Sequence, residues 1–340
     1  MPRTTARPVR GSGEDRIVRL LAERFGGPGP MLRQGIGDDA AVIRPRGAAE
    51  LWVVTTDLLL EGIDFRRSWT RPEQLGHRAL AVNLSDIAAM GARPRFYTVA
   101  LGLPRDCRRG WIDRFYQGMT ALGRRHRAHL VGGDLSASQH GIHVSVTVLG
   151  ESLARNVVLR SGGRAGDLLY VTGTLGKSAA GLELLERGRR RASPPARAAI
   201  AAHLWPEPRC DAGLWLTRRG FARAMIDLSD GLSVDLPRLA RASGTGAEVA
   251  ADRLPVFAAS GRWGADPLRL ALDGGDDYEL LVAVRSRDAA RLEAEYPRSL
   301  PPLTRIGRLA SQAGVRIARG RGGGPSPLPP RGHDHFRGGG

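Results

Sequence analysis

The sequence predicts a mixed α/β fold of two domains, and three observations lead to this prediction. Strand-like and helix-like segments alternate along most of the chain, as is typical of α/β proteins. The 340 residues, 42% of them hydrophobic and 25% charged, are enough to bury two cores. The glycine-rich stretch "RSGGRAGD" places a boundary near residues 150–166. We therefore expect domains at residues 1–150 and 151–320, followed by a Gly/Pro/Arg-rich tail at 321–340.

Periodicity predicts the individual elements. Runs rich in aliphatic and β-branched residues predict strands at residues 51–56, 95–101, 142–150, 167–172, 224–227 and 278–284. Helical spacing predicts helices at residues 72–90, 109–125, 177–187, 231–242 and 287–296. Ser286 is a candidate N-cap for the last of these helices. From Gly320 to the terminal "GHDHF" we expect a mobile tail.

Composition argues against several classes of protein. The formal charge of +17 is compatible with nucleic-acid binding, but the arginines are dispersed and aromatic residues make up only 5%, so we expect no nucleic-acid partner. Cys107 and Cys210 are isolated and indicate neither a disulfide framework nor a metal site. No apolar run reaches the roughly 18 residues of a membrane span, and the N-terminus lacks an apolar signal segment. We expect no membrane association and a cytoplasmic location.

The stretch "GIGDDAAVI" places Asp38 and Asp39 side by side, between a glycine turn and an apolar strand. Two adjacent carboxylates raise each other's pKa unless a cation neutralises them. Asp and Gly are also ordinary turn residues. The stretch by itself therefore leaves a solvated turn and a cation site open.

Further aspartates follow at the ends of apolar segments. Asp57 and Asp64 lie in "TTDLLLEGIDF", Asn83 and Asp86 share a face of an apolar helix, Asp134 follows Gly132 and Gly133, Asp227 and Asp230 flank Ser229, and Asp276 and Asp277 lie in "LDGGDDYELL". Each could be a turn or an N-cap residue. Together, and without zinc-type His or Cys companions, they predict an oxygen-only site for several Mg²⁺ ions and a nucleotide.

Two common catalytic motifs are missing. "VTGTLGKS" ends like a phosphate-binding loop, but Val171 stands where the first glycine of that motif is required. The chain also has no G-x-S-x-G nucleophile elbow.

The motifs resemble those of the thiamine-monophosphate kinase family, whose superfamily includes aminoimidazole ribonucleotide synthetase and selenophosphate synthetase. "GIGDDAAV", "TTDLLLEGIDF", "NLSDIAAMGARP", "GGDLSAS", "RSGGRAGDLLYVTGTLG", "IDLSDGL" and "GGDDYELL" occur in that family's order over about residues 14 to 310, and "GHDHF" follows near the C-terminus. The resemblance implies an aminoimidazole ribonucleotide synthetase-like architecture. In it, an N-terminal ATP- and Mg²⁺-binding domain pairs with its copy in a homodimer, and a C-terminal domain closes over the substrates.

The resemblance also implies roles for individual residues. The implied magnesium ligands are Asp38, Thr55, Thr56, Asp57, Asp86, Asp134, Asp227 and Asp230. The implied nucleotide contacts are Tyr116, Gly133, Asp134, Arg160 and Ser229. Asp64, Asp276 and His333 would face the thiamine phosphate. Asp276 stands where glutamate is common in the family, and His333 where Phe, Tyr or Trp is common.

The implied reaction is transfer of the γ-phosphoryl group of ATP, a co-substrate, to thiamine monophosphate. The nucleophile is already an anion, so we expect no general base and a reliance on positioning and Mg²⁺. One alternative is another ATP-using member of the superfamily with a different acceptor. A second alternative, from another class, is a non-catalytic protein that binds nucleic acid through its basic surface.

Overall fold

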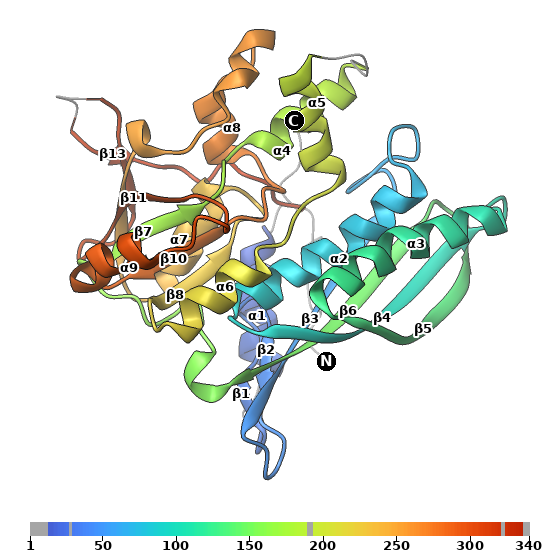
Figure 1. Cartoon of the computed structure of the whole chain (residues 1–340), viewed down its shortest axis with the longest axis horizontal. Helices are drawn as coiled ribbons and strands as arrows, with labels where there is room; N and C mark the ends of the chain where they lie inside the picture. Colours follow the sequence, from blue (N-terminus) through green and yellow to red (C-terminus); the bar gives the residue numbers. More distant parts are fainter. Residues whose placement is uncertain (1–12, 27–28, 189–192, 321–323, 336–340) are drawn as a thin grey trace, which may run out of the picture.

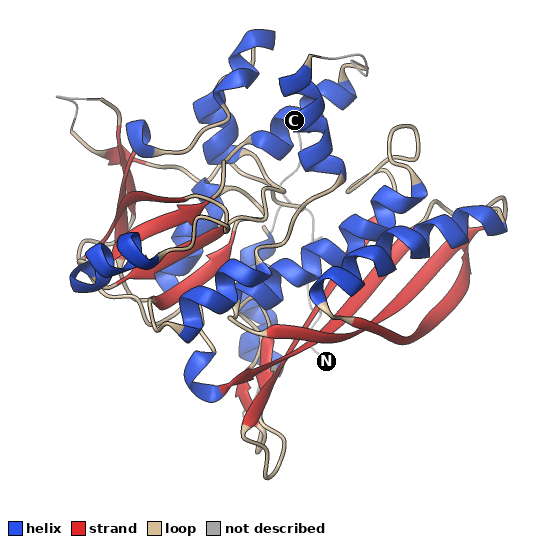
Figure 2. Ribbon diagram, in the orientation of Figure 1, coloured by secondary structure: helices blue, strands red, loops and turns tan. Residues whose placement is uncertain are grey.

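The computed structural model describes residues 13–26, 29–188, 193–320 and 324–335, and it confirms a mixed α/β fold built on two sheets (Figures 1 and 2). The N-terminal segment 1–12 and Phe336 of "GHDHF" lie outside the described residues. Among the helices of the described ranges, none is long and apolar enough to cross a membrane.

The first sheet has six strands in the order β1-β2-β3-β6-β4-β5. The strands are β1 Leu32–Gln34, β2 Ala41–Ile43, β3 Glu50–Leu60, β4 Arg93–Pro104, β5 His129–Ser138 and β6 His143–Leu153. β4 and β5 are parallel, and the other neighbours are antiparallel. Burial alternates along β4 and β6, so one face of this sheet is covered and the other is open.

Helices α2 (Pro72–Ala89) and α3 (Arg109–His126) cover one face of the first sheet (Figure 1). The two helices lie close together, because a Cβ atom added at Gly76 would lie 1.9 Å from the Phe115 carbonyl oxygen. In α2, 15 of the 18 residues are buried. A helix buried on nearly every side must contact more than one layer, and α2 also contacts α6 and β8 beyond the first sheet.

The second sheet has seven strands in the order β13-β12-β9-β11-β7-β10-β8. The strands are β7 Leu168–Thr172, β8 Ala222–Asp227, β9 Gly246–Ala250, β10 Leu280–Val284, β11 Leu303–Ala310, β12 Val315–Ala318 and β13 Ser326–Pro327. The remaining α-helices of the described residues are α1 Glu14–Phe25, α4 Lys177–Glu186, α5 Pro194–Leu204, α6 Cys210–Arg218, α7 Leu232–Ala242, α8 Pro267–Asp273 and α9 Ala289–Glu295.

The strands at the centre of the second sheet are buried on both faces. On β10, Leu280 and Val282 belong to the core around α2 and α3, whereas Leu281 and Ala283 belong to the core around α7. This explains why β7 and β10 are continuous apolar runs rather than alternating ones. The two sheets are therefore joined through a shared core that passes through α2.

All six predicted strands and all five predicted helices are present, with ends shifted by a few residues. The prediction of an N-cap at Ser286 was wrong, because Ser286 begins a 3-10 turn and α9 starts after Asp288 without a side-chain cap. The tail also differs from the expectation: Ser326–Pro327 pairs with β12 as β13, and Leu328 is buried. An edge position tolerates proline, since its outer side needs no backbone donor.

Candidate functional site

A cavity of about 870 Å³ lies between the two sheets. Its walls include the start of β2, the second half of β3, α1, α2, α4, α7, the segment after β8, the segment before β10 and the C-terminal segment. The predicted site residues that line the cavity are Asp38, Thr55, Thr56, Asp57, Asp64, Asp86, Arg160, Asp227, Ser229, Asp230, Asp276 and His333. The fold therefore brings most of the motifs together from both domains.

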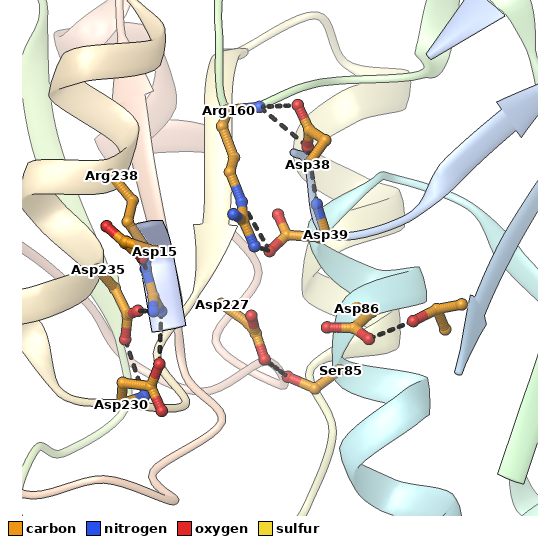
Figure 3. Close-up of polar contacts among 11 residues, drawn as sticks. Asp15, Asp38, Asp39, Ser85, Asp86, Arg160, Asp227, Asp230, Asp235 and Arg238 are labelled. Carbon is orange, nitrogen blue, oxygen red and sulfur yellow. Dashed lines mark hydrogen bonds and ion pairs between the residues drawn. The ribbon is translucent and has the colours of Figure 1, made fainter. Parts of the chain in front are cut away.

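Three carboxylates form the closest group in this cavity. Oxygens of Asp39, Asp86 and Asp227 all lie within 4.8 Å of one another, and Figure 3 shows these side chains facing a common space. Ser85 Oγ donates to Asp227 Oδ2 at 2.6 Å, and Thr55 Oγ1 donates to Asp86 Oδ2 at 2.5 Å. These hydroxyls orient the acidic side chains but add no positive charge.

The carboxylates are poorly solvated and repel one another. Burial, with the charge of Asp39, raises the pKa of Asp38 to about 7 and that of Asp227 to about 7. Burial, with the charges of Asp230 and Asp64, raises the pKa of Asp57 to about 6. The pKa of Asp86 is raised well above its ordinary range by burial and by its acidic neighbours. Such a cluster is unfavourable as a set of bare anions, and a cation would relieve it.

Two buried carboxylate oxygens of this group lack a partner. Asp39 Oδ2 and Asp57 Oδ2 make no hydrogen bond to any described residue. Buried polar atoms are normally satisfied, so each exception needs an explanation. Oxygen donors with free lone pairs in an all-carboxylate set fit a hard divalent cation such as Mg²⁺. Asp39 was not among the ligands that the sequence motifs implied, although its position beside Asp38 was visible in "GIGDD".

Arg160 lies against the same aspartate pair. Its backbone N–H donates to Asp38 at 3.2 Å, and its guanidinium Nη2 donates to Asp39 Oδ1 at 2.5 Å (Figure 3). Asp39 therefore contacts Arg160 through one oxygen and also belongs to the three-carboxylate group. An arginine at the edge of such a cluster can also contact a phosphate.

Asp230 is separate from the three-carboxylate group. Its side chain pairs with Arg238, which also pairs with Asp235 at 2.9 Å and Asp15 at 3.0 Å (Figure 3). The Asp230 carbonyl oxygen accepts the His333 N–H at 3.0 Å. Helix α1 and the C-terminal segment therefore meet beside Asp230, at the rim of the cavity.

Other predicted residues have local structural partners. Asp64 Oδ2 accepts the Leu60 N–H at 2.7 Å and closes the turn after β3. Asn83 Nδ2 donates to the Ala79 carbonyl oxygen on its own helix and does not line the cavity. Asp277 accepts the N–H of Gly176 at 2.6 Å. The N-terminus of α4, within "VTGTLGKS", therefore binds the Asp277 carboxylate. This agrees with the absence of the phosphate-loop spacing from that stretch.

Tyr116, Gly133 and Asp134 do not line the cavity. Asp134 pairs across the first sheet with Ala100, then Ser145, then Leu58. Asp134 lies three strand spacings from β3, a distance of about 14 Å. Residues paired in this way project to the same face, and Leu58 is exposed on the open face. Asp134 therefore points out of the open face, and Tyr116 lies on the outer helix α3.

Comparison with known proteins agrees with this geometry. Family models described as "AIR synthase related protein, N-terminal domain" and "C-terminal domain" match residues 37–152 and 164–319. The two sheets and the cavity between them thus define a two-domain protein of the AIR synthase related class. Curated thiamine-monophosphate kinases also resemble the chain over most of its length. The Bacillus subtilis protein is 34% identical over 89% of this chain and 93% of its own length.

The Salmonella typhimurium thiamine-monophosphate kinase is 37% identical over 95% of this chain and 98% of its own length. The solved structure "AaThiL complexed with AMPPCP and TMP" superposes with a TM-score of 0.84 at 32% identity, covering 98% of this chain and 100% of that one. The chain belongs to the thiamine-monophosphate kinase family.

Proposed function

We propose that this protein transfers the γ-phosphoryl group of ATP to thiamine monophosphate, giving thiamine diphosphate and ADP. The observation that carries the proposal is the group of carboxylates Asp39, Asp86 and Asp227, which residues of the family's motifs bring into one cavity. The solved relative named above was complexed with AMPPCP and TMP, and it covers nearly the whole chain.

The reaction needs positioning more than acid–base chemistry. A phosphate oxygen of thiamine monophosphate forms a bond to the γ-phosphorus, and the bond from that phosphorus to the oxygen bridging to the β-phosphate breaks, leaving its electrons on ADP. No proton has to be removed from the nucleophile. The chain's task is therefore to hold two anionic substrates in line and to balance their charge.

Mg²⁺ is the ion that suits this donor set, and Asp38, Asp39, Asp57, Asp86 and Asp227 are the residues that would hold it. When bound, it would supply charge neutralisation for the phosphates. Arg160 would contact the nucleotide from the same side, because its guanidinium is anchored at Asp39. Asp64, Asp276 and His333 line the cavity and would meet the acceptor.

The proposed function is tested by incubating purified protein with ATP, Mg²⁺ and thiamine monophosphate and separating the products by chromatography. We expect thiamine diphosphate and ADP in equal amounts. Parallel reactions with thiamine and with aminoimidazole ribonucleotide precursors examine the alternative of another acceptor. Turnover of one of these in preference to thiamine monophosphate would overturn the proposal.

Mg²⁺ should stabilise the protein more at about pH 8 than at about pH 5. Asp38, Asp57 and Asp227 have pKa values raised to about 7, 6 and 7 in the fold. A carboxyl group with a raised folded pKa favours folding below its unfolded pKa, and this contribution is lost as pH rises through the folded pKa. The metal-free protein therefore loses stability across this range, and Mg²⁺ binds where the ligands are ionised.

The measurement is the shift of the unfolding temperature caused by the same Mg²⁺ concentration, relative to EDTA, at the two pH values. A Mg²⁺ concentration about 100-fold above the dissociation constant stabilises the folded protein by about 2.7 kcal/mol. Equal shifts at both pH values would show that these carboxylates do not hold the ion.

His333→Ala should raise the KM for thiamine monophosphate about two- to tenfold, because a ring stacked on a heterocycle contributes about 0.5–1.5 kcal/mol. His333 lines the cavity and is held there by its backbone bond to Asp230. The KM for ATP and kcat should change little, which is the signature of lost uniform binding. His140→Ala, at an exposed loop, is the control. An unchanged acceptor KM in His333→Ala would place His333 outside the acceptor site.

We further propose that the protein works as a homodimer, with the N-terminal domain binding ATP and Mg²⁺ and the C-terminal domain closing over the acceptor. Support comes from exposed apolar side chains, which are Trp52, Leu58 and Phe96 on the open face and Leu130, Val131 and Leu135 along β5. An open face and an exposed edge strand of this kind are normally covered by a partner. A second copy packed on this face would also place its own cavity within reach of Asp134.

A further inference from the structure

Arg78 on α2 is a charged residue that the implied site roles leave unassigned. It is only 5% exposed, yet it lines the cavity. Arginine is rarely buried to this extent unless it has a specific partner. Its surroundings therefore indicate what it does.

Arg78 holds one end of the Asp276 carboxylate. Arg78 Nη2 donates to Asp276 Oδ2 at 2.8 Å, and Tyr278 OH donates to Asp276 Oδ1 at 2.8 Å. Both carboxylate oxygens are engaged, so the side chain of Asp276 has a defined orientation. Although burial raises the pKa of Asp276, the charge of Arg78 lowers it below the ordinary value, and the carboxylate is ionised.

His203 contacts Arg78 as a neutral side chain, so it adds no charge beside the guanidinium. His203 Nε2 lies 3.1 Å from Arg78 Nη1, and His203 Nδ1 lies 3.2 Å from Ser178 Oγ. Burial and the charge of Arg78 lower the pKa of His203 to about 3, so its imidazole is neutral. A neutral imidazole can accept the arginine N–H through Nε2 and donate through Nδ1. Asp276 is then the carboxylate that balances Arg78.

The backbone around Asp276 is unusual. Asp276 has φ 65° and Tyr278 has φ 50°, both in the left-handed region that non-glycine residues seldom adopt. The Asp276 N–H donates to the Ser229 carbonyl oxygen at 2.7 Å, and the Tyr278 N–H donates to the Leu228 carbonyl oxygen at 2.9 Å. Strain of this kind persists where surrounding contacts over-determine the conformation, often at functional sites.

One donor of Arg78 is still free. Arg78 Nε is buried and has no hydrogen-bond partner among the residues that the structure describes. An arginine with a purely structural role would normally be satisfied at every buried donor. Arg78 also comes from the N-terminal domain, whereas Asp276 comes from the C-terminal domain. The pair therefore connects the helix that carries Asp86 to the segment that faces the acceptor.

We propose that Arg78 is a positioning residue that holds Asp276 in the orientation in which Asp276 contacts the acceptor. The inference rests on the proposed function, because the acceptor contact of Asp276 is part of it. Asp276 is one methylene shorter than the glutamate common in the family, and the fixed guanidinium determines where this shorter side chain can reach.

The test compares Arg78→Met, which keeps bulk and removes the charge, with Arg78→Lys, Asp276→Asn and the double variant Arg78→Met/Asp276→Asn. We expect Arg78→Met to raise the KM for thiamine monophosphate at least about tenfold while the KM for ATP stays within about twofold. Arg78→Lys should recover much of the loss. The double variant should be no worse than the poorer single variant, because both changes remove one interaction.

Arg209→Met is the matched control. Arg209 makes a comparable buried pair with Glu279 at 2.6 Å, on the same segment as Asp276, but neither residue lines the cavity. It should lower the unfolding temperature and leave both KM values unchanged. If Arg78→Met does not fold, Tyr278→Phe removes the other donor to Asp276 and should raise the acceptor KM by a smaller factor.

Turnover of thiamine monophosphate by the wild-type protein is measured first. Its absence would overturn both the proposed function and this inference. If the wild-type protein is active, two results would overturn the role of Arg78 alone. The first is an equal rise of both KM values in Arg78→Met. The second is a rise of the acceptor KM in the double variant that equals the product of the rises in the two single variants.

Discussion

Asp86→Asn is expected to abolish turnover and, at the same time, to raise the unfolding temperature of the metal-free protein. Asp86 lies close to Asp39 and Asp227. Desolvation of its carboxylate, together with the charges of Asp57, Asp227 and Asp39, raises its pKa. Removing one charge relieves repulsion in the absence of a cation, and asparagine can still accept the Thr55 hydroxyl that bonds Asp86. Each kcal/mol gained corresponds to about 2–4 °C in domains of 150–250 residues.

The same change removes a ligand charge where the phosphates react. Lost stabilisation of several kcal/mol lowers kcat about a thousandfold or more. The two effects of opposite sign are measured by steady-state kinetics with Mg²⁺ and by thermal unfolding in EDTA. Asp252→Asn, which alters an exposed aspartate outside the cavity, should change neither quantity. A lower unfolding temperature in Asp86→Asn would mean that the aspartate is structural and that no cation site lies there.

Mixing inactive Asp134→Asn protein with inactive Asp86→Asn protein is expected to restore activity. Asp134 points out of the open sheet face, about three strands from β3, whereas Asp86 lines the cavity of its own chain. If Asp134 acts in the partner's cavity, a mixed dimer contains one complete site. Random assortment should give about a quarter of the wild-type activity, because half of the dimers are mixed and one site in two is complete.

The chains must exchange, so the two proteins are denatured and refolded together, with each variant refolded alone as the control. Light scattering of the wild-type protein should give the mass of a dimer. A monomeric mass would contradict the homodimer. A dimeric mass without recovered activity would show that Asp134 does not complete a site across the interface.

Much of the fold was accessible from local pattern. β6 alternates apolar and polar residues. Between Ala79 and Ala89, α2 is mainly apolar with three polar residues, so both elements were predicted. β5 was missed as a strand, because it contains two glycines and is exposed along most of its length. α5 was missed because its alanines give no distinct face. β13 forms only by pairing with β12, which a proline-rich segment does not indicate.

By itself, the sequence determined the mixed α/β class, the family and a set of aspartates at the ends of apolar segments, because these depend on residue type and spacing along the chain. Only the tertiary structure decided which aspartates meet. It added Asp39 to the group, paired Asp230 with Arg238, and turned Asp134 to the open face. It also placed Arg78 against Asp276, 198 positions away in the chain. The physical reason is that charge interactions act through short distances in a dry interior, and sequence spacing does not specify those distances.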